Sequence, residues 1–174
     1  MNDNIVAIST APGIGAISII RLSGNDVIDI VDSIFSNDLK NALSHTINYG
    51  YIVDNGEIID EVLISVMRSP KTYTKEDVVE INCHGGIATT NKILEIILTK
   101  GVRLADQGEF TKRAFLNGRI DLTKAESVMD LIESKSDLSR KLAIEGLQGK
   151  VFNLIDTFRN DIKNLLSQIE VNID

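Results

Sequence analysis

The chain has 174 residues, 43% hydrophobic and 25% charged, an ordinary composition for a soluble globular protein of one or two domains. Its formal net charge of −7 argues against an autonomous nucleic-acid binder, which needs a basic surface. A single cysteine excludes an intrachain disulfide and fits a reducing, cytoplasmic location. No apolar run approaches the ~20 residues that span a bilayer, and the acidic start MNDNIVAIST is not expected to be a signal peptide.

The first 35 residues indicate two short strands and one helix. Residues 5–9 and 16–22 are apolar enough for strands, and the second is apolar enough to be central in a sheet. The segment between them, Ala-Pro-Gly-Ile-Gly, can only be a tight loop. Residues 26–35 are expected to form an amphipathic helix. Its apolar residues fall on one face: Val27, Ile30, Val31 and Ile34.

A β-hairpin is expected from residues 45–53 and 57–67. The dipeptide between its arms, Asn55-Gly56, is favoured in a two-residue type I′ turn. The second arm alternates in polarity, which places its apolar residues on one side of the sheet. These residues are Val62, Ile64 and Val66.

A polar loop at residues 68–77 separates the hairpin from another expected strand at 78–83. His84-Gly85-Gly86 then leads into a helix that should end at Gly101. The apolar face of this helix includes Ile93, Ile96 and Ile97. A glycine-rich turn exposes N–H groups at a helix N-terminus and can bind an anion, although many such turns need glycine for geometry alone.

Residues 108–116 predict a short basic helix, followed by a turn at Asn117-Gly118. Thr123 and Glu126 have the spacing of a capping box, so a longer helix is expected to start there. Three cations cluster in this part of an otherwise acidic chain: Lys112, Arg113 and Arg119. Physical chemistry alone leaves a solvated basic corner between two domains about as plausible as a functional site.

Beyond Thr123, apolar residues recur every three to five positions, which predicts helices packed in a bundle with this stripe in its core. The stripe comprises Leu138, Leu142, Leu147, Val151, Leu154, Phe158, Ile162, Leu165 and Ile169. Breaks are expected near residues 134–136 and at Gly146 or Gly149. The predicted fold class is therefore α+β: an N-terminal domain with a mainly antiparallel sheet and flanking helices, followed by an all-helical segment.

Two charged residues lie inside strands that are otherwise apolar. Arg21 is costly within residues 16–22 unless its head reaches water or finds a partner. Glu80, between Val79 and Ile81, needs hydrogen-bond donors, which a ligand or Arg21 could supply. The residues alone leave open both a structural ion pair and a ligand site.

No phosphate-binding P-loop is expected. Such a loop needs G-x-x-x-x-G-K-[ST] between a strand and a helix. The nearest candidate ends at Gly149-Lys150, but Ile144 replaces the first glycine and Val151 replaces the Ser or Thr. This chain is therefore expected neither to bind nor to hydrolyse GTP. It also has no Cys/His cluster that predicts a zinc site.

Two long motifs resemble those of the MnmE (TrmE) family of tRNA modification GTPases. GEFTKRAFLNGRIDLTKAESV closely resembles the family block GEFT-x-RAFLNGK-x-DL-x-QAEAV. TYTKEDVVEINCHGG resembles S-[FY]-T-G-ED-x-[VL]-E-x-x-x-HGG, with Lys75 in place of the usual glycine. The resemblance covers essentially the whole chain. It implies residues 1–118 as a tetrahydrofolate-binding and dimerisation domain, and residues 119–174 as the first helices of the central helical domain.

The resemblance also implies a function and a set of site residues. Family members carry Arg, Glu and Lys at the places of Arg21, Glu80 and Arg119, which makes these three the expected folate-binding residues. The expected cofactor is 5-formyltetrahydrofolate or 5,10-methylenetetrahydrofolate, the one-carbon donor for an aminomethyl-type modification of the tRNA wobble uridine. No catalytic residue and no metal ligand of this chain is implied.

Further partners follow from the same resemblance. The family forms cytoplasmic homodimers and works with a flavoprotein of the MnmG (GidA) type on tRNA. Full-length members are hydrolases that use GTP, magnesium and potassium. Their GTPase domain and C-terminal cysteine motif are expected to follow the segment present here.

Two other functions compete with this one. The first is a purely structural module that dimerises or docks a partner, with Arg21, Glu80 and Arg119 in ion pairs. The second is a stand-alone enzyme of the aminomethyltransferase type. The long apolar stripe after Thr123 counts against the second, because half a helical bundle leaves apolar surface uncovered.

Overall fold

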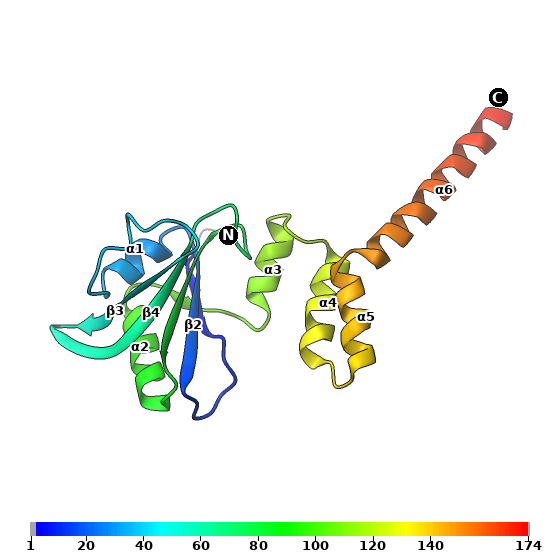
Figure 1. The fold of residues 1–174 in the computed structure, drawn as a ribbon. Coiled ribbons are helices and arrows are strands. Elements are labelled where there is room, and N and C mark those ends of the chain that lie inside the picture. Colours follow the sequence, from blue (N-terminus) through cyan, green and yellow to red (C-terminus); the bar gives the residue numbers. More distant parts are fainter. Residues whose placement is uncertain (1–2, 174) are drawn as a thin grey trace. The chain divides into compact units, whose positions relative to one another are not determined.

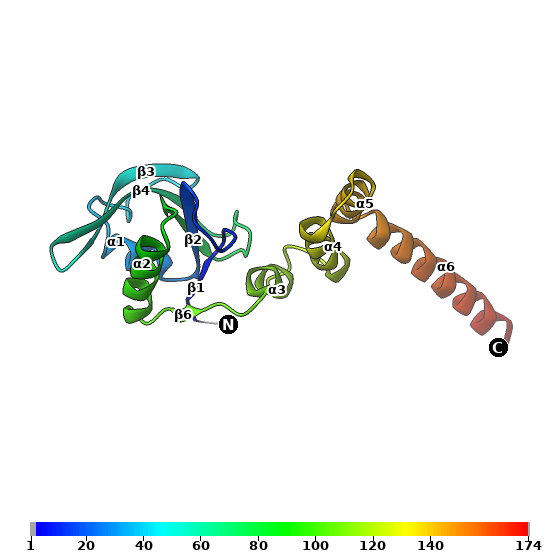
Figure 2. The same ribbon diagram turned by 90° about the horizontal axis from the view of Figure 1, so that it is seen from below.

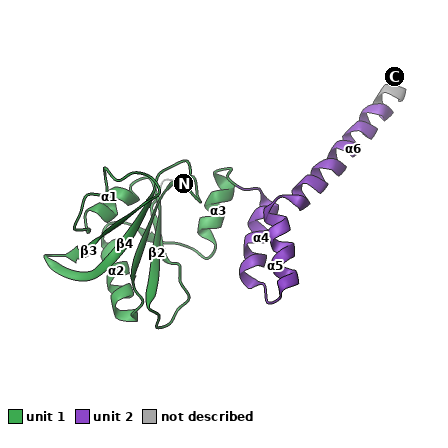
Figure 3. Cartoon of the chain, in the orientation of Figure 1, with its two compact units in different colours: residues 1–119 green, residues 120–174 purple. Residues whose placement is uncertain are grey.

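The structure is a computed structural model that describes residues 3–173 (Figure 1). The chain divides into two compact units, residues 1–119 and residues 120–174, coloured green and purple in Figure 3. Unit 1 contains every strand of the described residues, and unit 2 is helical. This division between a mixed α+β part and an all-helical part confirms the predicted fold class.

Unit 1 is built on a six-stranded sheet in the order β3-β4-β5-β2-β1-β6. The strands are β1 (Ile5–Ile8), β2 (Ile17–Gly24), β3 (Thr46–Asp54), β4 (Glu57–Met67), β5 (Asp77–His84) and β6 (Arg103–Leu104). Neighbouring strands are antiparallel, except that β6 pairs with β1 in parallel. The sheet is therefore mainly antiparallel, as the sequence predicts, with one short parallel edge strand that it does not.

Two helices, α1 (Val27–Asp32) and α2 (Ile87–Thr99), cover one face of this sheet (Figure 2). The alternating residues of β4 are buried there, as are the predicted apolar residues of α2, and all belong to one core cluster. These residues are Val62, Ile64, Val66, Ile93, Ile96 and Ile97. Because successive strand residues point to opposite faces, the residues between them form a second face, here called the outer face.

Helix α1 is shorter than the predicted range 26–35. Its last turn tightens, since Ile34 and Phe35 donate to carbonyls three residues back instead of four. Phe35 then forms an isolated antiparallel bridge with Ile52 of β3. The end of the predicted helix therefore pairs with the edge of the sheet instead of continuing as a helix. Ile34 and Phe35 are nevertheless buried.

The hairpin turn is confirmed. Asn55 and Gly56 both have positive φ, 49° and 84°, as a type I′ turn requires. Helix α2 ends just before Gly101, whose φ of 83° is the left-handed conformation expected after a helix C-terminus.

After β6, the chain forms α3 (Glu109–Leu116) and turns at Asn117-Gly118. Only Gly118 uses the positive φ that the dipeptide permits, at 68°. Asn117 instead donates its side-chain amide to the carbonyl of Thr74 at 2.6 Å. The turn is therefore tied to the loop between β4 and β5.

Unit 2 contains α4 (Leu122–Glu133), α5 (Asp137–Leu147) and α6 (Lys150–Ile173). The predicted breaks are confirmed: Ser136 caps α5, and Gly149 separates α5 from α6 with a φ of 85°. Gly146 lies against Ser127, where a Cβ atom would collide with the hydroxyl, so α4 and α5 pack closely at this point. The segment ending at Gly149-Lys150 joins two helices, without the preceding strand that a P-loop has.

Two expectations about unit 2 are wrong. The cap of α4 is Asp121, whose carboxylate accepts a hydrogen bond from the Lys124 N–H at 2.9 Å, and not the box of Thr123 and Glu126. The apolar stripe is also not buried within this chain. Leu154, Phe158 and Ile162 of α6 are each more than half exposed, and α6 has no buried side chain among residues 150–169. A helix alone cannot cover its own apolar stripe, so periodicity predicts the face but not what covers it.

Among the described residues, no helix is both long and apolar enough to cross a membrane.

Candidate functional site

Arg21 and Glu80 lie directly opposite each other on the neighbouring strands β2 and β5. Both belong to the outer face, since Ile20, Leu22 and their neighbours across the sheet point into the core. The Arg21 Nε donates to the Glu80 Oε1 at 2.7 Å, and the two side chains remain 33% and 22% exposed. The structure thus brings two of the three predicted site residues together as an ion pair.

This ion pair uses only some of the hydrogen-bonding groups of Arg21 and Glu80. The Nε contact is the one hydrogen bond that either side chain makes within the described residues. The two terminal NH₂ groups of Arg21 and the second carboxylate oxygen of Glu80 therefore remain free to meet a ligand. A fixed carboxylate next to an available guanidinium edge can recognise a molecule that presents both N–H donors and oxygen acceptors.

Helix α3 lies against this pair and supplies an aromatic side chain. The guanidinium carbon of Arg21 is 5.7 Å from the centre of the Phe110 ring, which is within the range of a cation–π contact. Such a contact leaves the hydrogen-bonding edges of the guanidinium available while fixing its plane.

Arg119, the third predicted residue, makes its contact elsewhere. Its guanidinium carbon lies 4.8 Å from the centre of the Tyr73 ring. The Tyr73 hydroxyl is 2.9 Å from the Thr111 hydroxyl on α3, one residue after Phe110. Among the described residues, no direct contact joins Arg119 to Arg21 or Glu80. Helix α3 instead contacts both places through adjacent residues.

Arg119 and Tyr73 line a cavity of about 400 Å³, here called the cationic cavity. It lies between the loop after β4 and the turn after α3, and its other lining residues are His45, Met67, Pro70, Lys71, Thr72 and Lys75. This lining includes two lysines and an arginine but no aspartate or glutamate. An anionic group is the ligand that such a lining favours.

In the loop beside this cavity, Lys75 occupies a position where the family motif has glycine. Lys75 has a φ of 59°, a left-handed conformation that glycine adopts without strain. The family motif has glycine at this place, whereas Lys75 here donates its ammonium group to the Gly118 carbonyl at 3.0 Å.

A buried charge cluster fixes the position of α3. The Arg113 side chain is only 1% exposed, and its guanidinium contacts the carboxylates of Asp3, Glu76 and Glu109 at 2.8, 3.1 and 3.1 Å. Arg103 adds a second guanidinium, 2.7 Å from Glu109. The hydrogen bond from Arg103 is the main reason why the pKa of Glu109 falls to about 2.

Of the three clustered cations, only Arg113 departs from the alternative of a solvated basic corner. Arg113 is among the largest fully buried side chains of the described residues, while Lys112 and Arg119 are exposed. The spacing of Glu109 and Arg113, four residues apart on a helix, is the sequence signal that could have indicated their pairing.

The glycine-rich turn before α2 has a geometric role. Gly85 packs against the backbone at Gly15, where a side chain would collide, and the N–H of Gly15 donates to its carbonyl at 3.2 Å. This close approach accounts for glycine at position 85 without a bound anion.

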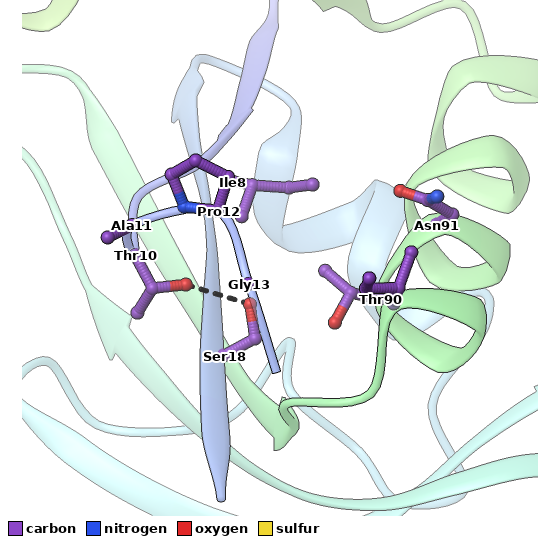
Figure 4. Close-up of a pocket in the computed structure, with 9 residues that line it drawn as sticks. Ile8, Thr10, Ala11, Pro12, Gly13, Ser18, Thr90 and Asn91 are labelled. Atoms are coloured by element: carbon purple, nitrogen blue, oxygen red, sulfur yellow. Dashed lines mark hydrogen bonds between the residues drawn. The ribbon is translucent and has the colours of Figure 1, made fainter. Parts of the chain in front are cut away.

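A second cavity of about 300 Å³ lies beside this turn, between the loop after β1 and the start of α2 (Figure 4). Figure 4 shows the Thr10 and Ser18 hydroxyls on its wall, joined by a hydrogen bond of 2.8 Å. None of its lining residues is charged, and Arg21, Glu80 and Arg119 are not among them. We therefore place the candidate site at α3 and not here.

The outer face also carries an apolar patch next to Arg21 and Glu80. The strand register aligns Tyr49, Leu63, Asn82 and Ile19 across four strands. The neighbouring row runs from Ile47 through Ser65 to Glu80 and Arg21. Tyr49, Leu63 and Ile47 are 54%, 46% and 68% exposed.

Within the described residues, no group of His, Cys, Asp and Glu is arranged to hold a metal ion.

Comparison with known proteins identifies both units. Residues 4–119 match a family described as the N-terminus of the GTP-binding protein TrmE, and residues 122–174 match the MnmE helical domain. A tRNA modification GTPase MnmE from Streptococcus thermophilus is 60% identical over 173 residues. Proteins of the same name from Latilactobacillus sakei and Levilactobacillus brevis are 57% and 59% identical over 175 residues. The matches cover 99% of this chain but only 38% of each relative. By both family matches and these identities, the chain belongs to the MnmE family of tRNA modification GTPases.

Proposed function

We propose that unit 1 binds a reduced folate at Arg21, Glu80 and Arg119. The ligand is 5-formyltetrahydrofolate or 5,10-methylenetetrahydrofolate, which supplies the one-carbon unit for an aminomethyl-type modification of the tRNA wobble uridine. The observation that carries this proposal is the half-exposed Arg21–Glu80 pair, which keeps a carboxylate oxygen and two NH₂ groups free.

The chemistry of these side chains suits the ligand. The amino-pyrimidine edge of a pterin presents N–H donors, which a fixed carboxylate such as Glu80 accepts. Arg21 can donate to ring or formyl oxygens, while Arg119 can pair with the carboxylates of the glutamate tail. Tyr73 and Phe110 supply aromatic faces next to the two guanidinium groups. The residues present therefore fit the group.

The wider proposal follows from the family. In the cytoplasm, a longer protein containing this chain forms a homodimer and works on tRNA with an MnmG (GidA)-type flavoprotein. That longer protein hydrolyses GTP, with magnesium and potassium, in a further domain. The apolar patch on the outer face supports dimerisation through unit 1, next to the proposed folate site.

Calorimetric titration with 5-formyltetrahydrofolate tests the binding proposal. Glu80→Gln keeps the shape of the side chain but removes its charge, and hydrogen bonds to charged groups contribute roughly 1.5–3 kcal/mol each. We expect affinity to fall roughly 10- to 100-fold. Glu95→Gln, an exposed change of the same kind on α2, should bind like the wild type.

One observation favours a second candidate, a structural module that dimerises or docks a partner without folate. Arg21 and Glu80 already neutralise each other, as a purely structural ion pair would. In that case the wild-type chain takes up no folate, and Glu80→Gln lowers only its stability. Equal folate affinity of the wild type and Glu80→Gln would remove Glu80 from the binding site.

A further inference from the structure

The cationic cavity differs in charge from the chain that contains it. The whole sequence has a net charge of −7, yet Lys71, Lys75 and Arg119 line this cavity with no acid among them. Lys71 and Lys75 are both exposed, so a ligand in the cavity can reach them. The cavity thus concentrates positive charge in a concave part of an acidic protein.

The walls of the cavity are held in place before any ligand arrives. Lys75 ties the loop after β4 to Gly118, and Tyr73 holds that loop to α3 through Thr111. Thr72 is buried and donates its hydroxyl to the Glu76 carbonyl at 2.6 Å. A preformed site loses less conformational entropy when a charged ligand binds.

Arg119 belongs both to this cavity and to the proposed folate site. When Arg119 pairs with the carboxylate end of a folate, that end lies at the cavity that Lys71 and Lys75 also line. A volume of about 400 Å³ is within the usual range for a small-ligand site and exceeds the need of one carboxylate. It suits a chain of several carboxylates.

We propose that the cationic cavity binds the γ-linked oligoglutamate tail of the folate, so that the preferred ligand is a polyglutamylated folate. This inference rests on the proposed function. RNA phosphate is the other polyanion to consider, but a strand of RNA is followed by an extended basic surface, and this chain is acidic overall.

The test compares the monoglutamate and triglutamate forms of 5-formyltetrahydrofolate by calorimetry on this chain. The wild type should bind the triglutamate roughly 3- to 30-fold more tightly, since two further carboxylates meet two exposed cations. This ratio should shrink as salt is raised, because exposed charge pairs are screened.

Lys71→Gln combined with Lys75→Gln should reduce the ratio of the two affinities to near one. Lys100→Gln, which removes the same kind of charge from the end of α2, should keep the wild-type ratio. Unchanged circular dichroism of each variant shows that the fold is retained, and the single Lys71→Gln variant should give an intermediate ratio.

The inference and the proposed function fail in different ways. Equal affinity of both forms for the wild type overturns the inference but leaves folate binding in place. A triglutamate preference that survives in the double variant also overturns it. An unchanged ratio together with weaker tRNA binding by the double variant would assign the cavity to RNA phosphate. Binding of neither form overturns the proposed function and this inference together.

Discussion

Two buried residues, Glu109 and Arg113, anchor α3 next to the candidate site. Both are almost completely buried, and removing one partner of a buried ion pair leaves the other charge uncompensated, which typically costs 3–5 kcal/mol. Since Phe110 and Thr111 lie between them on α3, this buried cluster also positions the aromatic contact with Arg21.

The low pKa of Glu109 predicts how unit 1 responds to acid. Its folded-state pKa of about 2 lies below the ordinary value of 4.5, so its contribution is fully present above pH 4.5 and is lost as pH falls towards 2. The difference corresponds to at most roughly 3–4 kcal/mol of stability. We expect the free energy of unfolding in urea to fall across this window.

Glu109→Gln should remove that part of the pH dependence as well as destabilise the protein at pH 7. Glu95→Gln, whose side chain is exposed on α2, serves as the control and should follow the wild type at every pH. A pH dependence in Glu109→Gln that matches the wild type would show that other carboxylates carry the effect.

The sequence indicates some of these residues but not their environment. The outer-face positions of Arg21 and Glu80 follow from strand alternation, so their pairing is a possibility that the residues alone raise. The burial of Arg113 could not be predicted, because its partners Asp3 and Glu76 lie 110 and 37 residues away in the sequence. Pairing over such separations depends on the tertiary fold.

At the scale of elements, turns and helix breaks that depend on a few neighbouring residues are predicted well from the sequence. The hairpin follows from Asn55-Gly56 and from strict alternation in β4, and the break before α6 follows from Gly149. The two-residue strand β6 has no periodicity to detect, and its pairing with β1 arises only in the folded sheet. The early end of α1 likewise depends on the bridge between Phe35 and Ile52.

The cap of α4 gives a prediction at this scale. Asp121 accepts from the Lys124 N–H and from the Thr123 hydroxyl at 2.9 and 2.6 Å, so Asp121→Ala should destabilise α4 by about 1 kcal/mol. The matched variant Glu126→Ala should have little effect, because Glu126 takes no part in this cap. Hydrogen exchange of the α4 amides measures both changes. Faster exchange in Glu126→Ala, with no change in Asp121→Ala, would show that Thr123 and Glu126 form the capping box after all.

At the scale of the whole molecule, the described residues expose apolar side chains on the outer face of unit 1 and along the stripe of unit 2. Periodicity predicts the residues of the stripe, but it cannot tell a surface covered within the chain from one covered by another molecule. Oligomeric state therefore has to be measured for each unit.

We expect the chain to be a homodimer in light scattering, and residues 1–119 alone to remain a dimer through the outer face. Leu63→Asp, which places a charge in the patch, should shift both chains towards the monomer. Leu43→Asp changes a more exposed leucine outside the patch and should have no effect. A monomer for residues 1–119, with a dimer for the whole chain, would place the contact in the helices.

The contact between Asp3 and Arg113 has a consequence for the order in which the molecule is completed during synthesis. Asp3 is synthesised before its partner Arg113, which follows 110 residues later. At about 5–20 residues per second, this interval lasts roughly 5 to 20 seconds. The pairing of β1 with β6 is delayed in the same way, because residues 5 and 6 pair with residues 103 and 104. The contacts between the two ends of unit 1 therefore cannot form until most of unit 1 has been synthesised.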